Sequence, residues 1–177
     1  MTPDSIGLLS RPFSVANLPS RGTEVRVEAT ADELAALAKH FDLAAIHSLS
    51  ARLHVKGSPA RVHVTGTLKA AVVQTCVVTL EPFETALEEE VEVTFRAPMP
   101  GEDNVDPAEE VEADLDAPDQ LVGDRIDLGA ITVEFLSLGL DPYPRKPGVE
   151  FDAAPAGAAD EGGSAFAALK RLRDKDA

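Results

Sequence analysis

Apolar and polar residues alternate along much of the N-terminal half of the chain, and this period of two predicts β-strands. The run Glu24–Ala29 is the first and shortest. A second strand begins at Leu49 and ends at Lys56. After a break at 57–60 the alternation resumes at Arg61 and keeps its phase as far as Leu80, and a last run ends at Phe95. Successive strands joined by short turns predict an antiparallel meander.

The break at 57–60 reads Gly-Ser-Pro-Ala and predicts a four-residue turn. In that register Lys56 lies opposite Arg61, and His54 lies opposite His63. All polar residues of the hairpin then share one face, which supports this register because a slip of one residue would bury charged groups. This outward face is basic and rich in histidine, and its side chains are the candidate binding residues: Arg52, His54, Lys56, Arg61, His63 and Lys69.

Two segments have the signals of helices. Thr30 and Glu33 form a capping box, and apolar residues at helical spacing follow as far as Phe41, where this helix should end. Asp127 can cap a second helix that ends at Gly139 and carries the apolar residues Leu128, Ile131, Phe135, Leu136 and Leu138. The predicted fold class is therefore α+β, with an antiparallel meander sheet of about four strands packed by two helices.

The remaining segments are expected to lie outside the packed core. Residues 97–125 are acidic and punctuated by prolines, which predicts a long mobile loop within a single domain over 1–152. Residues 153–163 read as a flexible linker, and 164–177 as a short basic amphipathic peptide. This peptide could occupy a groove on a partner or pack on its own domain, and its candidate docking residues are Phe166, Leu169, Lys170, Arg171 and Leu172.

Charge is unevenly distributed over the 177 residues, whose formal net charge is −15. Residues 81–120 hold 15 acidic residues and one basic residue, whereas residues 39–75 hold five basic residues and one acidic residue. The molecule should therefore present a basic patch and an acidic arm. The hydrophobic content of 44% suffices for a core, and neither a membrane segment nor a signal peptide is expected. A single cysteine fits a reducing cytoplasm.

Catalytic and metal-binding signatures are missing from the sequence. There is no glycine-rich phosphate loop and no nucleophile elbow, and Cys76 lies in the apolar phase of its strand, where a packed and inert thiol is expected. His54 and His63 could meet across the hairpin as a weak metal site, but two solvated histidines are the favoured interpretation. We therefore expect no enzymatic activity, no metal, no cofactor and no small-molecule substrate.

Three pieces of sequence, in order, resemble a known family. They are Gly66–Phe83, which contains Cys-Val-Val-Thr-Leu; Ile126–Pro142; and Ala165–Leu172. Their order, with an acidic loop between the first two, is similar to that of the YceD family, the large ribosomal RNA subunit accumulation proteins of bacteria and plastids. Many members carry a second cysteine three residues after the first, and Thr79 stands at that position here.

The resemblance implies a non-enzymatic factor for accumulation or processing of 23S-type ribosomal RNA and for assembly of the large subunit. Two kinds of partner are then open. The basic hairpin face could contact ribosomal RNA, or the acidic loop could hold a basic ribosomal protein. The alternative outside ribosome biogenesis is a generic acidic protein-interaction module, or a chaperone for some other basic partner.

Overall fold

The computed structural model describes residues 7–98, 118–121 and 123–150. The chain divides into two compact units, residues 1–146 and 147–177, and the second is described only over 147–150. Most of the acidic loop, the linker over 153–163 and the basic peptide with Phe166, Leu169, Lys170, Arg171 and Leu172 lie outside the described residues. No helix in the described ranges is long and apolar enough to cross a membrane.

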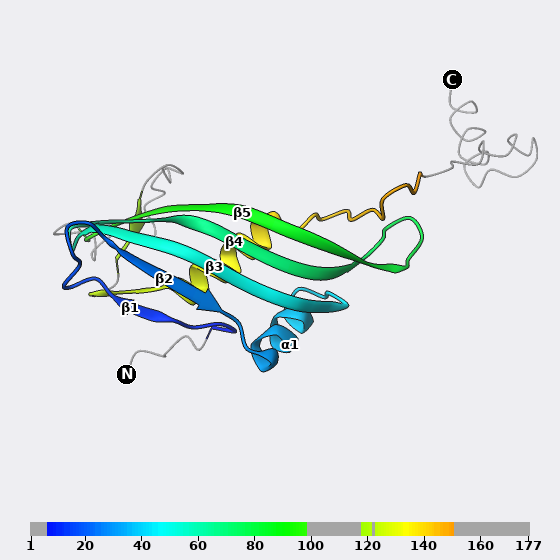
Figure 1. Ribbon diagram of the computed structural model, residues 1–177, viewed down its shortest axis with the longest axis horizontal. Helices are drawn as coiled ribbons and strands as arrows, with labels where there is room; N and C mark the ends of the chain where they lie inside the picture. The colour runs from blue at the N-terminus through cyan, green and yellow to red at the C-terminus, as the bar shows by residue number, and fades with distance from the viewer. Residues whose placement is uncertain (1–6, 99–117, 122, 151–177) are drawn as a thin grey trace, which may run out of the picture. The chain divides into compact units, whose positions relative to one another are not determined.

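A five-stranded sheet dominates the first unit, in the order β2-β3-β4-β5-β6 (Figure 1). Its strands are β2 (Thr23–Glu28), β3 (Ala45–Ser58), β4 (Arg61–Thr75), β5 (Pro82–Arg96) and β6 (Asp119–Gln120). All neighbours are antiparallel except β6, which runs parallel to β5. The α+β class and the meander are confirmed, with five strands in the sheet rather than about four.

Three strands were not predicted because they are too short to show alternation. β6 pairs only with Phe95 and Arg96 and lies inside the segment read as a loop over 97–125. β1 (Pro12–Ser14) and β7 (Arg125–Asp127) form a separate two-stranded antiparallel sheet. Its two strands are far apart in the sequence, and a local hydrophobic pattern carries no information about such pairing.

The β3–β4 hairpin is tighter than predicted. Ser58 pairs with Arg61, so the loop is only Pro59-Ala60, and Lys56 lies opposite His63 rather than Arg61. Gly57 explains the difference: its φ is +139°, and a Cβ at this position would lie 2.2 Å from the carbonyl oxygen of Arg61. Glycine thus lets the pairing continue where a turn was expected. The register moves by two residues, so every side chain keeps its predicted face.

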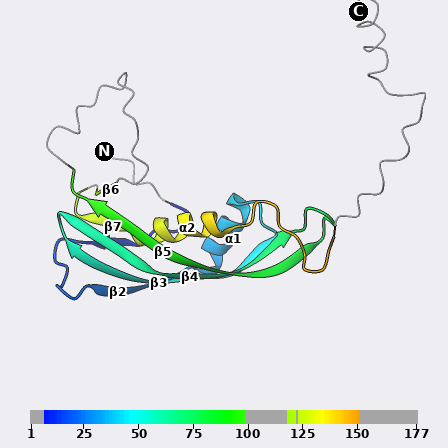
Figure 2. The same cartoon turned by 90° about the horizontal axis from the view of Figure 1, so that it is seen from above.

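Both helices lie on the same side of the sheet (Figure 2). α1 (Ala31–His40) begins at the predicted capping box, in which Thr30 Oγ1 accepts from the Glu33 amide and the Glu33 carboxylate accepts from the Thr30 amide. α2 (Leu128–Gly139) is capped by Asp127, whose carboxylate accepts from the amides of Gly129 and Ala130. The other face of the sheet carries no helix in the described ranges.

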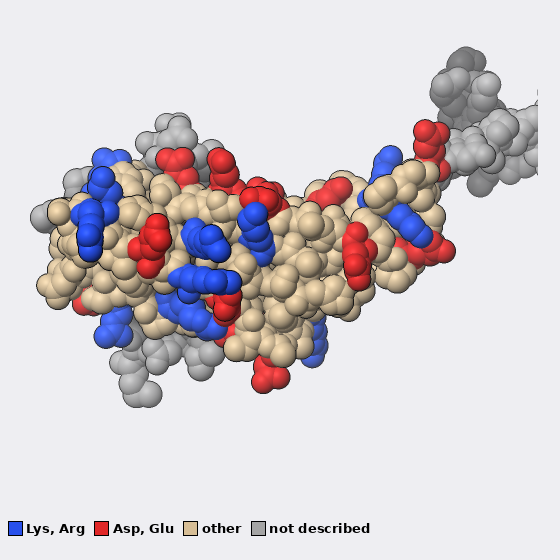
Figure 3. All heavy atoms as spheres, in the orientation of Figure 1, with Lys and Arg blue, Asp and Glu red and all other residues tan. Residues whose placement is uncertain are grey.

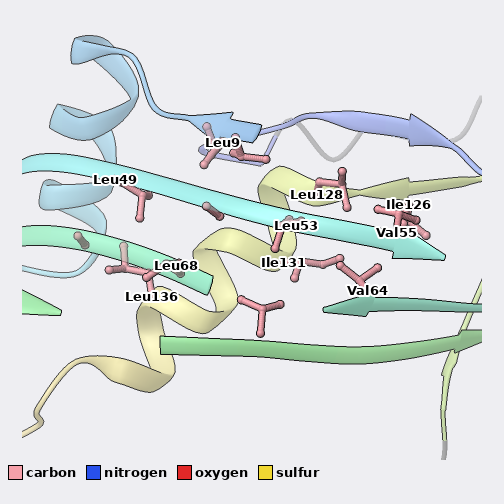
Figure 4. Packing of buried hydrophobic residues seen from close by; sticks show 14 of the residues in the cluster. Leu9, Leu49, Leu53, Val55, Val64, Leu68, Ile126, Leu128, Ile131 and Leu136 are labelled. Carbon is pink, nitrogen blue, oxygen red and sulfur yellow. The ribbon is translucent and has the colours of Figure 1, made fainter. Parts of the chain in front are cut away.

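The hydrophobic core lies between the sheet and α2 (Figure 4). Leu53, Val55, Val64 and Leu68 of the central strands are almost fully buried, as are Leu128 and Leu136 of α2. These residues share the inward phase that the alternation predicted.

Two apolar residues of the predicted elements are exposed rather than buried. β4 ends at Thr75 and the chain turns over 76–81, so Leu80 is 76% exposed and has a positive φ of 58°. Leu138, in the last turn of α2, is 71% exposed. Glu89, which is polar at an inward position, lies against Gly139 of α2, where a Cβ would be 2.5 Å from the Glu89 Cγ.

Arg11 joins the N-terminal segment to both helices. Its guanidinium donates to both carboxylate oxygens of Glu33, at 2.8 and 2.9 Å, and to the carbonyl oxygen of Glu28. Its own amide donates to the carboxylate of Asp127, which also accepts from the Ser10 hydroxyl. These contacts link the N-terminal segment to β2, to α1 and to the cap of α2.

Candidate nucleic-acid interface

The six predicted binding residues all point away from the helices, on the bare face of the sheet, called here the outer face. Arg52, Lys56, Arg61, His63 and Lys69 are exposed, and His54 is half-buried. Figure 3 shows lysine and arginine side chains over the middle and left of this face, with acidic side chains between them as well as along its upper margin. The six residues do not form one uniform patch, because they have different neighbours on β2 and β5, the strands that flank β3 and β4.

A basic cluster gathers at the hairpin end of the outer face. It consists of Lys56, Arg61, His63 and Arg96, called here the hairpin-end cluster. Lys56 pairs across the strands with His63, and Arg61 pairs with both Ser58 and Arg96. His63 Nδ1 lies 3.0 Å from the hydroxyl oxygen of Thr94. No acidic residue stands directly opposite Lys56, Arg61 or His63 in the ladder, so Lys56 and Arg61 concentrate positive charge here.

A second basic group lies at the middle of the same face. The register places Arg26 of β2 directly opposite Arg52 of β3, and Glu24 opposite His54. Here the surface is hollowed by a cavity of about 500 Å³, whose lining includes these four side chains together with Thr65 and Gly66. Arg26 also forms an ion pair with Glu28.

Lys69 differs from the other candidates because its charge is balanced. Its ammonium lies 2.9 Å from the carboxylate of Glu88, the residue opposite it on β5. Glu90 and Glu92 continue this acidic row on β5, opposite Thr67 and Thr65. The outer face is therefore basic over β3 and β4 and acidic along β5, whereas β2 contributes Glu24 and Glu28 beside Arg26. The hairpin pattern alone could not predict the acidic margin on β5.

The histidines do not assemble a metal site in the described part of the chain. His54 lies opposite Thr65 and His63 opposite Lys56, so the predicted meeting of the two across the hairpin is wrong. The described residues contain no group of three or more histidine, cysteine or acidic side chains placed to hold a metal.

Cys76 is buried, as predicted, but its surroundings are not those of an inert thiol. It sits at the start of the 76–81 turn, where the Lys146 amide donates to its Sγ at 3.4 Å. That bond, together with hydrogen bonds from the hydroxyl and amide of Thr79, lowers the pKa of the Cys76 thiol to about 6. The sequence pattern predicted the burial of Cys76 but not these hydrogen bonds, because β4 ends at Thr75, one residue before it.

Comparison with known families gives one match. A family model described as "Large ribosomal RNA subunit accumulation protein YceD" matches residues 64–173. The chain belongs to the YceD family. YceD membership indicates a role in the accumulation of large-subunit ribosomal RNA. No curated protein and no solved structure matches the chain.

The YceD match begins within β4, so it includes Lys69 and Arg96 but not the basic residues of β2 and β3. Sequence reasoning missed Arg26 and Arg96 as members of the basic face. Arg26 alternates with Val25 and Val27, which shows that it points outward, but its place beside Arg52 depends on which strand pairs with β2. Arg96 ends the acidic run of β5 and joins the basic cluster only through its pairing with Arg61.

Proposed function

We propose that this YceD protein supports 23S-type ribosomal RNA accumulation and large-subunit assembly in the cytoplasm by binding the RNA, without catalysing a reaction. The observation that carries the proposal is the hairpin-end cluster. Lys56 and Arg61 lie exposed on neighbouring strands of the outer face, and no acidic side chain stands opposite either of them in the ladder. Clustered cations on a protein of net charge −15 concentrate an attraction for phosphate at one place.

The distribution of charge also orients the RNA. The acidic row of β5 repels a phosphate backbone, whereas β3 and β4 attract it, so a bound strand would run along the basic side of the outer face. With so few aromatic residues, one Tyr and no Trp, binding relies on phosphate contacts rather than on base stacking. Such contacts give affinity with little dependence on base sequence.

Fluorescence anisotropy with fragments of large-subunit ribosomal RNA tests this proposal. Two phosphate contacts, from Lys56 and Arg61, predict a slope of log affinity against log salt of roughly −1.5. The double variant Lys56→Gln/Arg61→Gln should lower the magnitude of the slope by about 1.5. A matched control, Lys69→Gln/Lys146→Gln, removes the same charge from lysines that are already paired with Glu88 and Glu81. Equal binding by both double variants would refute the role of the cluster.

A second candidate partner is favoured by the acidic row of β5. Glu88, Glu90 and Glu92 project from one strand at alternate positions, and a basic segment of a ribosomal protein could lie along them. The docking peptide at 164–177 remains a proposed contact for such a protein. Crosslinking to ribosomal proteins that survives nuclease treatment and is lost in a Glu88→Gln/Glu90→Gln/Glu92→Gln variant would support this partner over RNA.

A further inference from the structure

We propose that the hollow between β2, β3 and β4 is a binding site for one phosphodiester group of RNA, held between Arg26 and Arg52. The inference rests on the proposed function and refines it, because it assigns a defined phosphate site apart from the hairpin-end cluster. It adds one residue, Arg26, that the sequence did not single out. Register, shape and chemistry each support the assignment.

The register brings two like charges together. Arg26 and Arg52 are direct cross-strand partners on the outer face, where side chains of such pairs lie about 5 Å apart at Cβ. Like charges directly opposite each other destabilise an antiparallel pair. The ion pair of Arg26 with Glu28 offsets part of this repulsion. No ion pair is found for Arg52 among the described residues, and an anion between the two guanidinium groups would relieve the rest.

The shape of the site follows from Gly66. This residue pairs with Leu53, and a Cβ on it would lie 2.0 Å from the carbonyl oxygen of Arg52. Only glycine allows β4 to approach β3 so closely, and a glycine inside a strand often marks such an approach or a bend. The cavity at this point, about 500 Å³, falls within the range of ordinary ligand sites.

The half-buried ring of His54 forms one wall of the hollow, and the chain at Gly22 packs over it. Gly22 has a φ of +81°, and a Cβ there would lie 2.6 Å from Nε2 of His54. This close packing fixes the position of the ring. The hollow thus has one wall, the ring of His54, whose position is fixed by the backbone at Gly22. Its two long cationic side chains, Arg26 and Arg52, can close on a ligand.

The chemistry selects a phosphodiester. A guanidinium presents paired N–H donors that match two oxygens of one phosphate, and two facing arginines can hold both sides of the group. Glu24 also lines the hollow and Glu28 pairs with Arg26, so two glutamates match the two arginines in formal charge, and Arg52 is the arginine for which no ion pair is found among the described residues. That balance suits the single charge of a backbone phosphodiester better than the near-double charge of free phosphate.

The position of the hollow suits a continuous RNA strand. Arg52 and Lys56 lie four residues apart on β3, which corresponds to about 13 Å along the strand. A short run of RNA could therefore contact the hollow and the hairpin-end cluster together. It would stay on the basic side of the acidic row on β5.

The test uses the full-length protein, a short single-stranded RNA of mixed sequence, and dimethyl phosphate as a minimal diester. Arg26→Gln/Arg52→Gln should weaken RNA binding by at least tenfold, because two charge-assisted contacts are lost. The control Lys69→Gln/Lys146→Gln should weaken binding less than threefold. Arg52→Lys should keep the salt dependence but lose part of the affinity, since it keeps the charge and lacks the fork. Dimethyl phosphate should shift the Nε–H resonances of Arg26 and Arg52 in NMR spectra, and inorganic phosphate should shift them less.

The outcomes separate this inference from the proposed function. If Lys56→Gln/Arg61→Gln abolishes RNA binding while Arg26→Gln/Arg52→Gln matches the charge control, the hollow is not a phosphate site and the hairpin-end cluster suffices. If the wild-type protein binds no ribosomal RNA, the proposed function fails and the inference fails with it. Equal melting temperatures of all variants, whose substituted side chains are exposed, exclude misfolding as the cause.

Discussion

Replacing Glu33 with glutamine isolates the ion pair that joins the N-terminal segment to α1. Glutamine keeps the size of the side chain and can still close the capping box with Thr30. It removes the negative charge that both nitrogens of the Arg11 fork contact, at 2.8 and 2.9 Å. We expect Glu33→Gln to destabilise the protein by about 1–2 kcal/mol at pH 7.

The magnitude follows from the acidity of Glu33. Hydrogen bonding by Arg11, followed by smaller contributions from Thr30, lowers the pKa of the Glu33 carboxyl from an ordinary 4.5 to about 2. At about 1.4 kcal/mol per tenfold change in acidity, this shift corresponds to roughly 3 kcal/mol. The side chains of Arg11 and Glu33 remain 34% and 23% exposed, so solvent screening reduces the expected effect to about half.

The dependence on pH gives a sharper test. The pKa of Glu33 is lower in the folded state, so its stabilisation is complete above about pH 4.5 and declines as the pH falls towards 2. Urea denaturation of wild type and Glu33→Gln at pH 7, 5 and 3 should show a difference that is constant at the first two values and less than half as large at the third. The exposed pair of Lys69 and Glu88 is the control, and Glu88→Gln should cost less than about 0.5 kcal/mol. A Glu33→Gln protein as stable as wild type at pH 7 would refute the reasoning.

Three further predictions concern the core, the thiol and the terminal peptide. Leu136→Ala should destabilise the protein by about 2–5 kcal/mol in urea denaturation, because Leu136 is fully buried. Leu138→Ala, at an exposed site in the last turn of the same helix, should change stability by less than about 0.5 kcal/mol. Similar losses in the two variants would contradict the packing of α2. The absorbance of the Cys76 thiolate should titrate near pH 6. The stability of wild type relative to Cys76→Ser should rise from about pH 6 to 9, because the folded state holds the thiol proton less tightly than the unfolded state. A midpoint of the thiolate titration above pH 8 would contradict the hydrogen bonding at Sγ. Removal of residues 164–177 should leave the melting temperature unchanged and weaken association with large-subunit precursors, and a lower melting temperature would instead show that the peptide packs on its own domain.

The sequence predicted well those features that depend on neighbouring residues. Both helices have their predicted caps, at Thr30 and at Asp127, because a cap is formed by side chains within one turn. The inward and outward faces of β3 and β4 were also correct, since alternation alone decides them. Even the error in the hairpin register left these faces unchanged.

Features that depend on distant pairing could not be predicted in this way. The ladder between β1 and β7 joins Pro12 to Asp127, and neither strand is long enough to show a pattern. Arg26 meets Arg52 only because β2 pairs with β3, and the pairing of Lys69 with Glu88 depends on β5. The basic face was therefore correctly located on the sheet, but its division into a hairpin-end cluster, a hollow and a neutralised lysine required the structure.

The most direct test of the account is co-sedimentation in sucrose gradients of cell extracts. The wild-type protein should sediment with precursors of the large ribosomal subunit and be absent from mature 70S particles. The Lys56→Gln/Arg61→Gln variant should remain at the top of the gradient and lower the amount of 23S-type RNA, whereas the charge-matched Lys69→Gln/Lys146→Gln control should behave as wild type. Sedimentation of the Lys56→Gln/Arg61→Gln variant with precursors, together with normal RNA levels, would contradict the claim that the protein acts by binding RNA through this face.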